Sequence, residues 1–480
     1  MNSTDQAFSG ARPSREGDLT LEMHGMAPIP ETDRYGGLLR VFTVWFTPNL
    51  VPAGFFIGTL ATASFVGVGF GLGLVAILVG TVIGSLPAAY LGTWGPRTGL
   101  GQLPLGRLVF GRSTLLPGGL MWLSTIAWDA INALFGAEAL ALLIHVPFWL
   151  GLAVILVLQG LLGLMGYEMV HTFQKWMSIV LALMFLLLTI RISSVGTASI
   201  PATAHGAGLA GGFVLMVTLS ASFVIAWATY AADYTRYMKP TTSRAGVFWL
   251  TLAGLTVSSV WVEVLGLAAS KIASDQTAAG MRTLAGGGVL GVLVLIAVAI
   301  GTVSVNAMND YSGSLSLQAA GARILRPAVA VIVTVVAFGL TLWLNTGDLA
   351  AKFTNILLFI TYWVPCYVAV VVVDWYRRGG RVNPSAILDS ATLPSGWTAL
   401  VALVVGFLVS IPFMDTSLYV GPAAKALQGA DIAYSVGFLV AGGVYAAIGA
   451  RVPHGVAAVP VTVPVPPPAG SGGASELSQA

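Results

Sequence analysis

The stretch W-F-T-P-N-L-V-P-A-G-F-F-I-G, residues 45–58, interrupts a long apolar segment with residues that break helices. Pro48 and Pro52 each remove a backbone donor and crowd the preceding turn, so a helix that crosses them must break or kink. Asn49 and Gly54 lie beside them, where an uninterrupted membrane helix would carry apolar side chains. The stretch therefore predicts a first membrane span that is broken near its middle.

A second apolar segment, T-L-S-A-S-F-V-I-A-W-A-T-Y at 218–230, is rich in small and hydroxyl residues around Trp227. In transporters built from inverted repeats, interrupted spans at corresponding positions of the two halves mark a binding site near the bilayer midplane. Gly and Pro are also frequent in membrane helices for packing alone. From these two segments, a transport site and a packing role both stay open.

The composition places these segments in a membrane protein. The chain has 480 residues, of which 56% are hydrophobic and 9% charged, whereas a soluble chain would carry roughly a quarter charged residues. Apolar runs long enough to cross a bilayer as helices recur throughout. We expect an all-α polytopic protein with about twelve spans. Two five-helix groups would cover roughly residues 41–192 and 211–375, followed by two extra helices over roughly 397–449.

The charge distribution predicts the orientation. Residues 1–36 and 451–480 are expected to be disordered ends, the second rich in Pro and Gly, on either side of a membrane domain at 37–450. An even number of spans places both ends on one side. Most of the 22 Lys and Arg residues fall on that side. The five that fall on the other side are Arg191, Lys271, Arg282, Lys352 and Lys425. The positive-inside rule then predicts a cell-membrane protein with both termini cytoplasmic.

The third span carries polar residues far from its ends, in W-D-A-I-N-A-L-F-G-A at 128–137. At 100° per residue, Trp128, Asn132 and Phe135 share one helix face, and Trp128 lies about 15 Å into the span. An indole and an amide one turn apart suit a flat ring with polar edges, because the indole offers a stacking face and the amide a donor and an acceptor. The alternative is that Asn132 links two helices. Because none of the cations lies in the middle of a span, the cargo is expected to be neutral or cationic.

Taken together, several motifs resemble the nucleobase–cation symporter family, in its cytosine–purine permease branch. They are W-F-T-P-N at 45–49, G-P-R-T-G-L-G-Q-L-P-L-G-R-L-V-F-G at 95–111, W-D-A-I-N-A-L-F-G-A at 128–137, D-Y-T-R-Y at 233–237 and N-D-Y-S at 309–312. The resemblance covers about residues 35–450. It implies a five-plus-five inverted repeat of the LeuT type with two extra helices, alternating access, and uptake of a base driven by an ion gradient.

The resemblance also implies roles for individual residues. Trp128 matches the tryptophan that stacks on the substrate, and Asn132 the polar residue one turn later that hydrogen-bonds it. Trp227 matches the tryptophan on the other face of the ring, and Asn309 the asparagine that contacts the base. The broken first helix near Ala53 and Gly54 is expected to offer backbone groups to the same pocket.

The coupling ion stays open between Na⁺ and H⁺. In sodium-coupled relatives, hydroxyls of the eighth span join first-span carbonyls around the ion, and here Ser304 is in place while Thr302 lies two residues earlier. Glu138, Glu263 and Asp310 are intramembrane carboxyls, which often carry protons in transporters. The alternative for each carboxyl is a hydrogen bond to a neighbouring helix.

Three classes of function can be compared. A secondary transporter explains the interrupted helices and the buried Trp–Asn face. A membrane-embedded enzyme would need a catalytic or metal-ligand cluster, and the scattered histidines and single cysteine do not provide one. A passive channel would not need an aromatic sandwich.

We therefore expect a symporter of cytosine or purines, or of a related neutral heterocycle such as uracil, hydantoin or allantoin, with no cofactor beyond the ion. Its partners would be that solute and the lipid bilayer, with no nucleic acid. The sequence does not indicate an oligomeric state.

Overall fold

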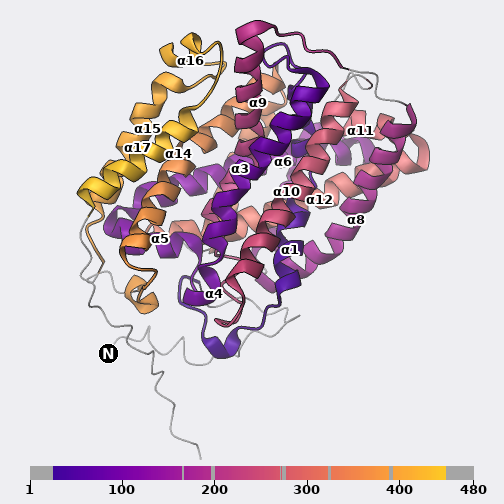
Figure 1. Ribbon diagram of the computed structural model, residues 1–480. Coiled ribbons are helices and arrows are strands. Elements are labelled where there is room, and N and C mark those ends of the chain that lie inside the picture. The colour runs from indigo at the N-terminus through magenta and orange to yellow at the C-terminus, as the bar shows by residue number, and fades with distance from the viewer. Residues whose placement is uncertain are drawn as a thin grey trace, which may run out of the picture.

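The computed structural model describes residues 25–164, 167–195, 200–270, 272, 277–322, 326–388 and 393–449. Within these residues, all regular elements are helices, and the β-type pairings are two isolated bridges, Gly36 with Met238 and Asp415 with Val420. The long helices pack side by side into one elongated bundle (Figure 1). The predicted all-α class is confirmed.

The first span is broken at the predicted place. Helix α1 covers Leu38–Phe46, a 3₁₀ turn covers Thr47–Asn49, and α2 covers Pro52–Leu60. The two parts are bent by 62°. Pro52 occupies the first turn of α2, where its missing N–H has no helical partner to lose. Between the parts, Leu50 and Val51 leave helical geometry, so the chain turns there and starts a new helix.

The rest of the first group follows in chain order. Its elements are α3 (Gly69–Gly92), α4 (Gly95–Thr98), α5 (Gln102–Phe110), α6 (Leu115–Ile144), α7 (Phe148–Leu164) and α8 (Tyr167–Val195). Helix α6 is 30 residues long and carries the Trp128–Asn132 face. Its most extensive neighbour is α12, which belongs to the second group.

The second group begins with α9 and is interrupted in its first span. Helix α9 (Gly206–Ile225) continues as a 3₁₀ turn at Ala226–Thr229, and the chain then runs through turns rather than a helix to Tyr237. The interruption predicted around Trp227 is therefore present. The later elements are α10 (Arg244–Ala269), α11 (Ala278–Leu284), α12 (Gly288–Ala319), α13 (Arg326–Leu344) and α14 (Leu349–Arg377).

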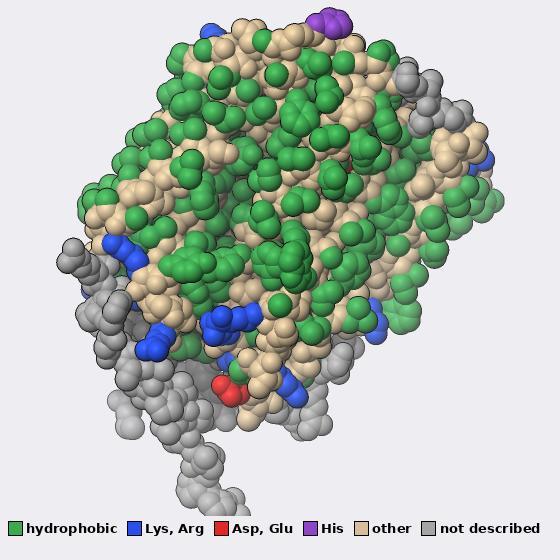
Figure 2. Space-filling model, in the orientation of Figure 1, with side chains coloured by type: hydrophobic (Ala, Val, Ile, Leu, Met, Phe, Trp, Pro, Cys, Tyr) green, Lys and Arg blue, Asp and Glu red, His purple; other side chains and the backbone are tan. Residues whose placement is uncertain are grey.

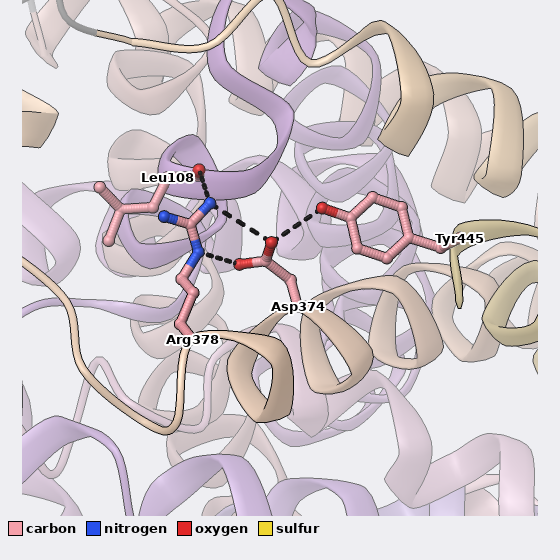
Figure 3. A network of polar contacts seen from close by, with 4 residues as sticks. All are labelled: Leu108, Asp374, Arg378 and Tyr445. Carbon is pink, nitrogen blue, oxygen red and sulfur yellow. Dashed lines mark hydrogen bonds and ion pairs between the residues drawn. The ribbon is translucent and has the colours of Figure 1, made fainter. Parts of the chain in front are cut away.

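The chain ends in a small cluster formed by α15 (Trp397–Ser410), α16 (Pro422–Ala426) and α17 (Ala433–Ile448). A polar network fixes this cluster to the bundle (Figure 3). The Asp374 carboxylate accepts hydrogen bonds from Tyr445 on α17 and Arg378 at the end of α14, and Arg378 also donates to the Leu108 carbonyl on α5. The network thereby joins α17 to the end of α14 and to α5.

The lengths and surfaces of the helices suit a bilayer. Seven described helices are long and apolar enough to cross it, the bent pair α1 and α2 makes up to eight, and four shorter apolar helices accompany them. Large apolar side chains such as Leu183 and Leu439 are 60% and 71% exposed on the outside. Figure 2 shows such side chains along the bundle, with Lys and Arg mainly towards the end where α4 lies. The chain is a multi-pass membrane protein, and the number of twelve spans stays a prediction.

Glycine allows the broken first span to pack closely on α10. A Cβ at Gly58 would lie 1.8 Å from the Glu263 carbonyl oxygen, and a Cβ at Gly266 would lie 1.8 Å from the Phe55 carbonyl oxygen. Side chains larger than hydrogen would force the two backbones apart. These reciprocal contacts fix α2 against α10 and so fix the position of the break.

The N-terminal end differs from the expected disorder up to residue 36. Residues 25–36 are described, and Arg34 is 7% exposed. Its guanidinium donates to the Ile29 carbonyl at 2.8 Å and to the Pro96 carbonyl at 2.9 Å. The segment is thus tied to the α4 region. The rest of the predicted N-terminal end, residues 1–24, and the predicted C-terminal end at 451–480 lie outside the described residues.

Candidate functional site

A cavity lies where the two broken spans meet α6 and α12. It contains about 320 Å³ of space free of atoms. It is lined by Pro48, Val51, Trp128, Asn132, Phe223, Ala226, Trp227, Tyr230, Val305 and Asn309. The four residues expected to contact the ring from the third, sixth and eighth spans (Trp128, Asn132, Trp227 and Asn309) therefore line one cavity.

The other three expected contacts lie behind the cavity wall. Phe135 is fully buried and packs against Phe56 of α2, with ring centroids 6.1 Å apart. Ala53 is also fully buried, and a Cβ at Gly54 would lie 3.0 Å from the Phe223 ring. The first span instead contributes Pro48 and Val51, which lie at the break itself. The sequence could not show which first-span residues line the cavity, because it does not show at which residue α2 begins.

Two aromatic residues are held in place by neighbours that line or flank the cavity. The Trp128 ring lies 5.9 Å from the Phe223 ring, centroid to centroid, at an interplanar angle of 55°. The Trp227 indole N–H donates to Asn49 Oδ1 at 2.9 Å, and Trp45 packs edge-on against the same indole at 5.7 Å. Asn49 itself donates to the Trp45 carbonyl at 2.7 Å. The break in the first helix thus positions the sixth-span tryptophan.

A chain of amides connects α6, α7 and α12 beside the cavity. Asn132 Nδ2 donates to Asn306 Oδ1 at 3.0 Å. Asn306 Nδ2 donates to Gln159 Oε1 at 2.7 Å and to the Asp129 carbonyl at 3.0 Å. Asn309 Nδ2 donates to Asp129 Oδ1 at 3.1 Å. Because each amide is fixed by a neighbour, the polar edge of the cavity has a defined orientation.

Three buried polar atoms at the cavity have no hydrogen-bond partner among the described residues. They are Trp128 Nε1, Asn132 Oδ1 and the Tyr230 hydroxyl. Their residues are 7%, 4% and 1% exposed. A buried polar group without a partner costs about 1–3 kcal/mol. A flat heterocycle with donors and acceptors on its rim is the kind of ligand that would satisfy such a set.

The two hydroxyls expected near an ion lie on different sides of α12. Ser304 Oγ is buried and has no hydrogen-bond partner among the described residues, while the Ser304 carbonyl accepts from Gln174 of α8 at 2.8 Å. Thr302 Oγ1 instead points to α6, where it donates to the Asn132 carbonyl at 3.3 Å. Two residues span about 200° on a helix, so Thr302 and Ser304 cannot share one face.

The three expected carboxyls have different surroundings. Glu138 accepts hydrogen bonds from Thr277 Oγ1 at 2.6 Å and from two backbone N–H groups at the start of α11. It therefore holds the N-terminal end of that short helix to α6. Glu263 is fully buried and accepts from Ser220 at 2.6 Å and from Thr81 at 3.5 Å, between α10, α9 and α3.

Asp310 lies next to Asn309 and faces away from the first cavity. It lines a second cavity together with Thr125, Gly160, Gly163, Leu164, Gly313, Ser314, Val329, Ala330 and Val333. A Cβ at Gly163 would lie 2.8 Å from Asp310 Cβ, so α7 approaches the aspartate closely. Of the three carboxyls, Asp310 is the one adjacent to a residue of the candidate site.

Several residues of this arrangement were missed by sequence reasoning. Asn306 and Gln159 join the amide chain, Asn49 fixes Trp227, and Asp129 accepts from Asn309. One signal was available for Asn306, which lies three residues before Asn309 and so shares its helix face. No comparable signal exists for Gln159, because its partner comes from α12, far away in the chain.

Sequence comparisons match most of this chain to permeases for cytosine and purines. A model of the family described as permease for cytosine/purines, uracil, thiamine, allantoin matches residues 28–437. A Bacillus subtilis protein, YxlA, whose name gives purine-cytosine permease as a provisional assignment, is 30% identical over 441 residues. That alignment covers 88% of this chain and 94% of YxlA. The purine-cytosine permease fcyB of Emericella nidulans is 26% identical over 446 residues, or 88% of this chain and 87% of that protein.

Solved structures show the same fold. The nucleobase-cation-symport-1 family transporter Mhp1, in a closed conformation with bromovinylhydantoin bound, superposes with a TM-score of 0.72 at 17% identity. The match covers 89% of this chain and 95% of Mhp1. The inward-facing conformation of Mhp1 gives a TM-score of 0.70. The predicted transporter architecture is therefore confirmed at the level of fold.

Proposed function

This chain belongs to the family of permeases for cytosine/purines, uracil, thiamine and allantoin, and we propose that it imports a nucleobase by cation symport with alternating access. It is a membrane transporter and not an enzyme. The proposed substrates are cytosine and purines, in keeping with the names of its relatives in Bacillus and Emericella. We further propose that it lies in the cell membrane with both termini in the cytoplasm, and that residues 37–450 form the transport domain.

One observation carries the substrate class. The cavity between the broken spans combines Trp128 and Trp227 with three buried polar atoms that lack partners among the described residues. Stacking a base on an aromatic ring contributes about 1–3 kcal/mol, and hydrogen bonds to the ring edge would remove the cost of the unpaired atoms. A neutral planar heterocycle fits both requirements.

Each cavity residue then has a proposed role. Trp128 and Trp227 stack on the ring, while Asn132 and Asn309 read its polar edge. Pro48 and Val51 provide the first-span contact in place of Ala53 and Gly54, and Phe135 supports the wall through Phe56. The broken spans are suited to alternating access, because their halves can move separately about the site.

A related heterocycle is the second candidate. The family model names uracil and allantoin beside cytosine and purines, and the structure of similar fold contains bromovinylhydantoin. These rings share flat faces and alternating donors and acceptors. They differ in the order of those groups, so the fixed amides of Asn132 and Asn309 would discriminate between them.

Uptake by reconstituted protein tests the proposal. Proteoliposomes loaded to give inward sodium and proton gradients are supplied with labelled cytosine, and unlabelled adenine, guanine, hypoxanthine, uracil, hydantoin and allantoin compete in turn. We expect cytosine or a competing base to accumulate above its equilibrium level, and ionophores to abolish that accumulation. Equilibration without accumulation would indicate a channel, and inhibition by none of the nucleobases would contradict the substrate class.

A further inference from the structure

A third cavity lies towards the end of the bundle that carries α4, between the segment after α3, helix α5 and the last turns of α14 (Figure 1). It contains about 280 Å³ of space free of atoms, close to the 320 Å³ of the cavity between the broken spans. Its lining includes Trp94, Gln102, Val371, Asp374 and Trp375. The two cavities therefore offer space to ligands of similar size.

Gln102, at the start of α5, brings an unpaired carboxamide to this cavity. The residue is fully buried, and its backbone groups are used: the N–H donates to Asp233 Oδ1 at 2.7 Å, and the carbonyl accepts from the Tyr367 hydroxyl at 3.2 Å. In its side chain, by contrast, Nε2 and Oε1 both lack a hydrogen-bond partner among the described residues. Because a buried polar group without a partner is unfavourable, a ligand with an acceptor and a donor side by side would be bound there.

Two indoles form the aromatic part of the same lining. The Trp94 and Trp375 rings are stacked, with centroids 4.2 Å apart and an interplanar angle of 9°. Since each ring covers one face of the other, a further flat ring can stack only on the outer faces of the pair. The third cavity thus combines aromatic rings with a carboxamide, as the first cavity does with Trp128 and Asn132.

The charge of this cavity is balanced within its wall. Asp374 is the one charged residue among the described residues that line it. Its carboxylate forms an ion pair with Arg378 and accepts a hydrogen bond from Tyr445 (Figure 3). A charged ligand would have to leave water for a site without a counter-charge, so the cavity favours a neutral one.

We propose that the third cavity is a second binding site for a neutral planar base, which stacks beside Trp94 and Trp375 and pairs with the Gln102 carboxamide. This inference rests on the proposed function, from which the class of ligand is taken. Cytosine and adenine each carry an amino donor next to a ring-nitrogen acceptor. A glutamine carboxamide pairs with such an edge through two hydrogen bonds, as it does with adenine in nucleic acids.

Helix α5 links this site to the transport cavity. The Asp233 carboxylate that accepts from the Gln102 N–H belongs to the interrupted part of the sixth span, and the Asp233 N–H donates to the Tyr230 carbonyl at 2.8 Å. Tyr230 lines the first cavity. A base held between α5 and α14 therefore stabilises the present arrangement of the second broken span.

Protection of an introduced cysteine tests the site in the detergent-solubilised full chain. Val382 lines the third cavity and is partly exposed, so Val382→Cys can react with a maleimide, whereas the native Cys366 is fully buried. We expect cytosine or adenine to slow this reaction, by about tenfold at about ten times its dissociation constant. The control Leu418→Cys replaces an 84% exposed residue before α16 and should react equally fast with and without base.

Gln102→Leu, made in the Val382→Cys protein, tests the carboxamide. The change removes polar atoms that have no partner among the described residues, so the Tm without base should not fall. The base concentration for half-maximal protection should rise roughly 5- to 150-fold, because two hydrogen bonds to the base are lost. Gln102→Met, which keeps an unbranched side chain, should give the same result. In the Val382→Cys protein, 1,3-dimethyluracil, which has acceptors but no N–H donor, should protect less than uracil.

A further variant separates this site from the transport cavity. With Trp128→Ala and Trp227→Ala both present, protection of Val382→Cys should persist, because the third cavity is intact. Loss of protection in that background, or equal protection in Gln102→Leu, would overturn the inference. A Val382→Cys protein that binds and transports cytosine without any protection, as expected if only water fills the cavity, would overturn it too and leave the proposed function intact. A wild-type protein that binds no base at all would contradict the proposed function itself.

Discussion

The indole N–H of Trp227 donates a 2.9 Å hydrogen bond to Asn49 Oδ1, which joins the interruption of the sixth span to the break in the first. Both residues are buried, and Trp227 lines the candidate cavity. The same indole packs edge-on against Trp45 of α1. The hydrogen bond fixes the ring plane, so the shape of the site depends on the two interruptions together.

Asn49→Ala should weaken base binding, although Asn49 does not line the cavity. The change leaves Trp227 Nε1 buried and without its acceptor, at a cost of about 1–3 kcal/mol. A double-mutant cycle with Trp227→Phe, scored by the dissociation constant for cytosine, checks the mechanism. Trp227→Phe keeps a stacking face and removes the donor, so Asn49→Ala should have little further effect in that background. Fully additive effects would show that Asn49 acts elsewhere.

Much of this architecture could be predicted from the sequence, because it depends on residues that act on neighbouring positions of the chain. Pro48 and Pro52 act on their own backbone, so the break could be located to within a few residues. The spacing of Trp128 and Asn132 follows from helical geometry, so their common face could be predicted as well. The lining roles of Trp227 and Asn309 came from motif resemblance.

The parts that could not be predicted depend on packing between distant segments. Asn306 donates to Gln159 across 147 positions of the chain, and no periodicity in either helix indicates that pairing. Phe135 shares the face of Trp128, but it is covered by Phe56 because α2 restarts after the break and packs there. Similarly, Glu138 lies in an apolar run, although α11 folds back to place backbone N–H groups on its carboxylate.

Removing the side-chain amide of Asn132 or of Asn309 should lower the affinity for some bases more than for others. Asn132→Ala and Asn309→Ala each leave a ring-edge group unpaired in a dry cavity, which costs about 1–3 kcal/mol. Competition by a panel of bases, each lacking one donor or acceptor, measures the loss for each ring position. A base that lacks the ring group contacted by the removed amide should lose less affinity than a base that carries this group. Equal losses for the whole panel would assign these amides to helix packing.

Ser304→Ala tests a sodium site directly. Ser304 Oγ is buried without a described partner, and hydroxyl oxygens suit a hard cation. If sodium is bound there, the sodium concentration needed for half-maximal cytosine uptake should rise in the variant. Thr302→Ala is the matched control, since Thr302 points to α6 and should leave the sodium dependence unchanged. Identical sodium dependence in wild type and Ser304→Ala would remove Ser304 from ion binding.

Gly58→Ala should destabilise the folded protein. Its new Cβ would lie 1.8 Å from the Glu263 carbonyl oxygen, so α2 and α10 must separate. Overpacking of this kind costs about 1–3 kcal/mol or more, and thermal unfolding in detergent measures it as a lower Tm. Gly71→Ala on α3 is the control, because nothing lies within 4 Å of its new Cβ. Equal Tm values for the two variants would contradict the close packing of the broken span.

The most direct test of the central claim, that the cavity between the broken spans binds a base by stacking, is equilibrium binding of labelled cytosine to the purified protein. Trp128→Ala and Trp227→Ala each remove a stacking face, and each should raise the dissociation constant roughly 5- to 150-fold, which corresponds to about 1–3 kcal/mol. Trp249→Ala, which removes a 63% exposed indole on α10, should leave it unchanged. Wild-type affinity in both cavity variants, with correct folding and membrane insertion, would contradict the account.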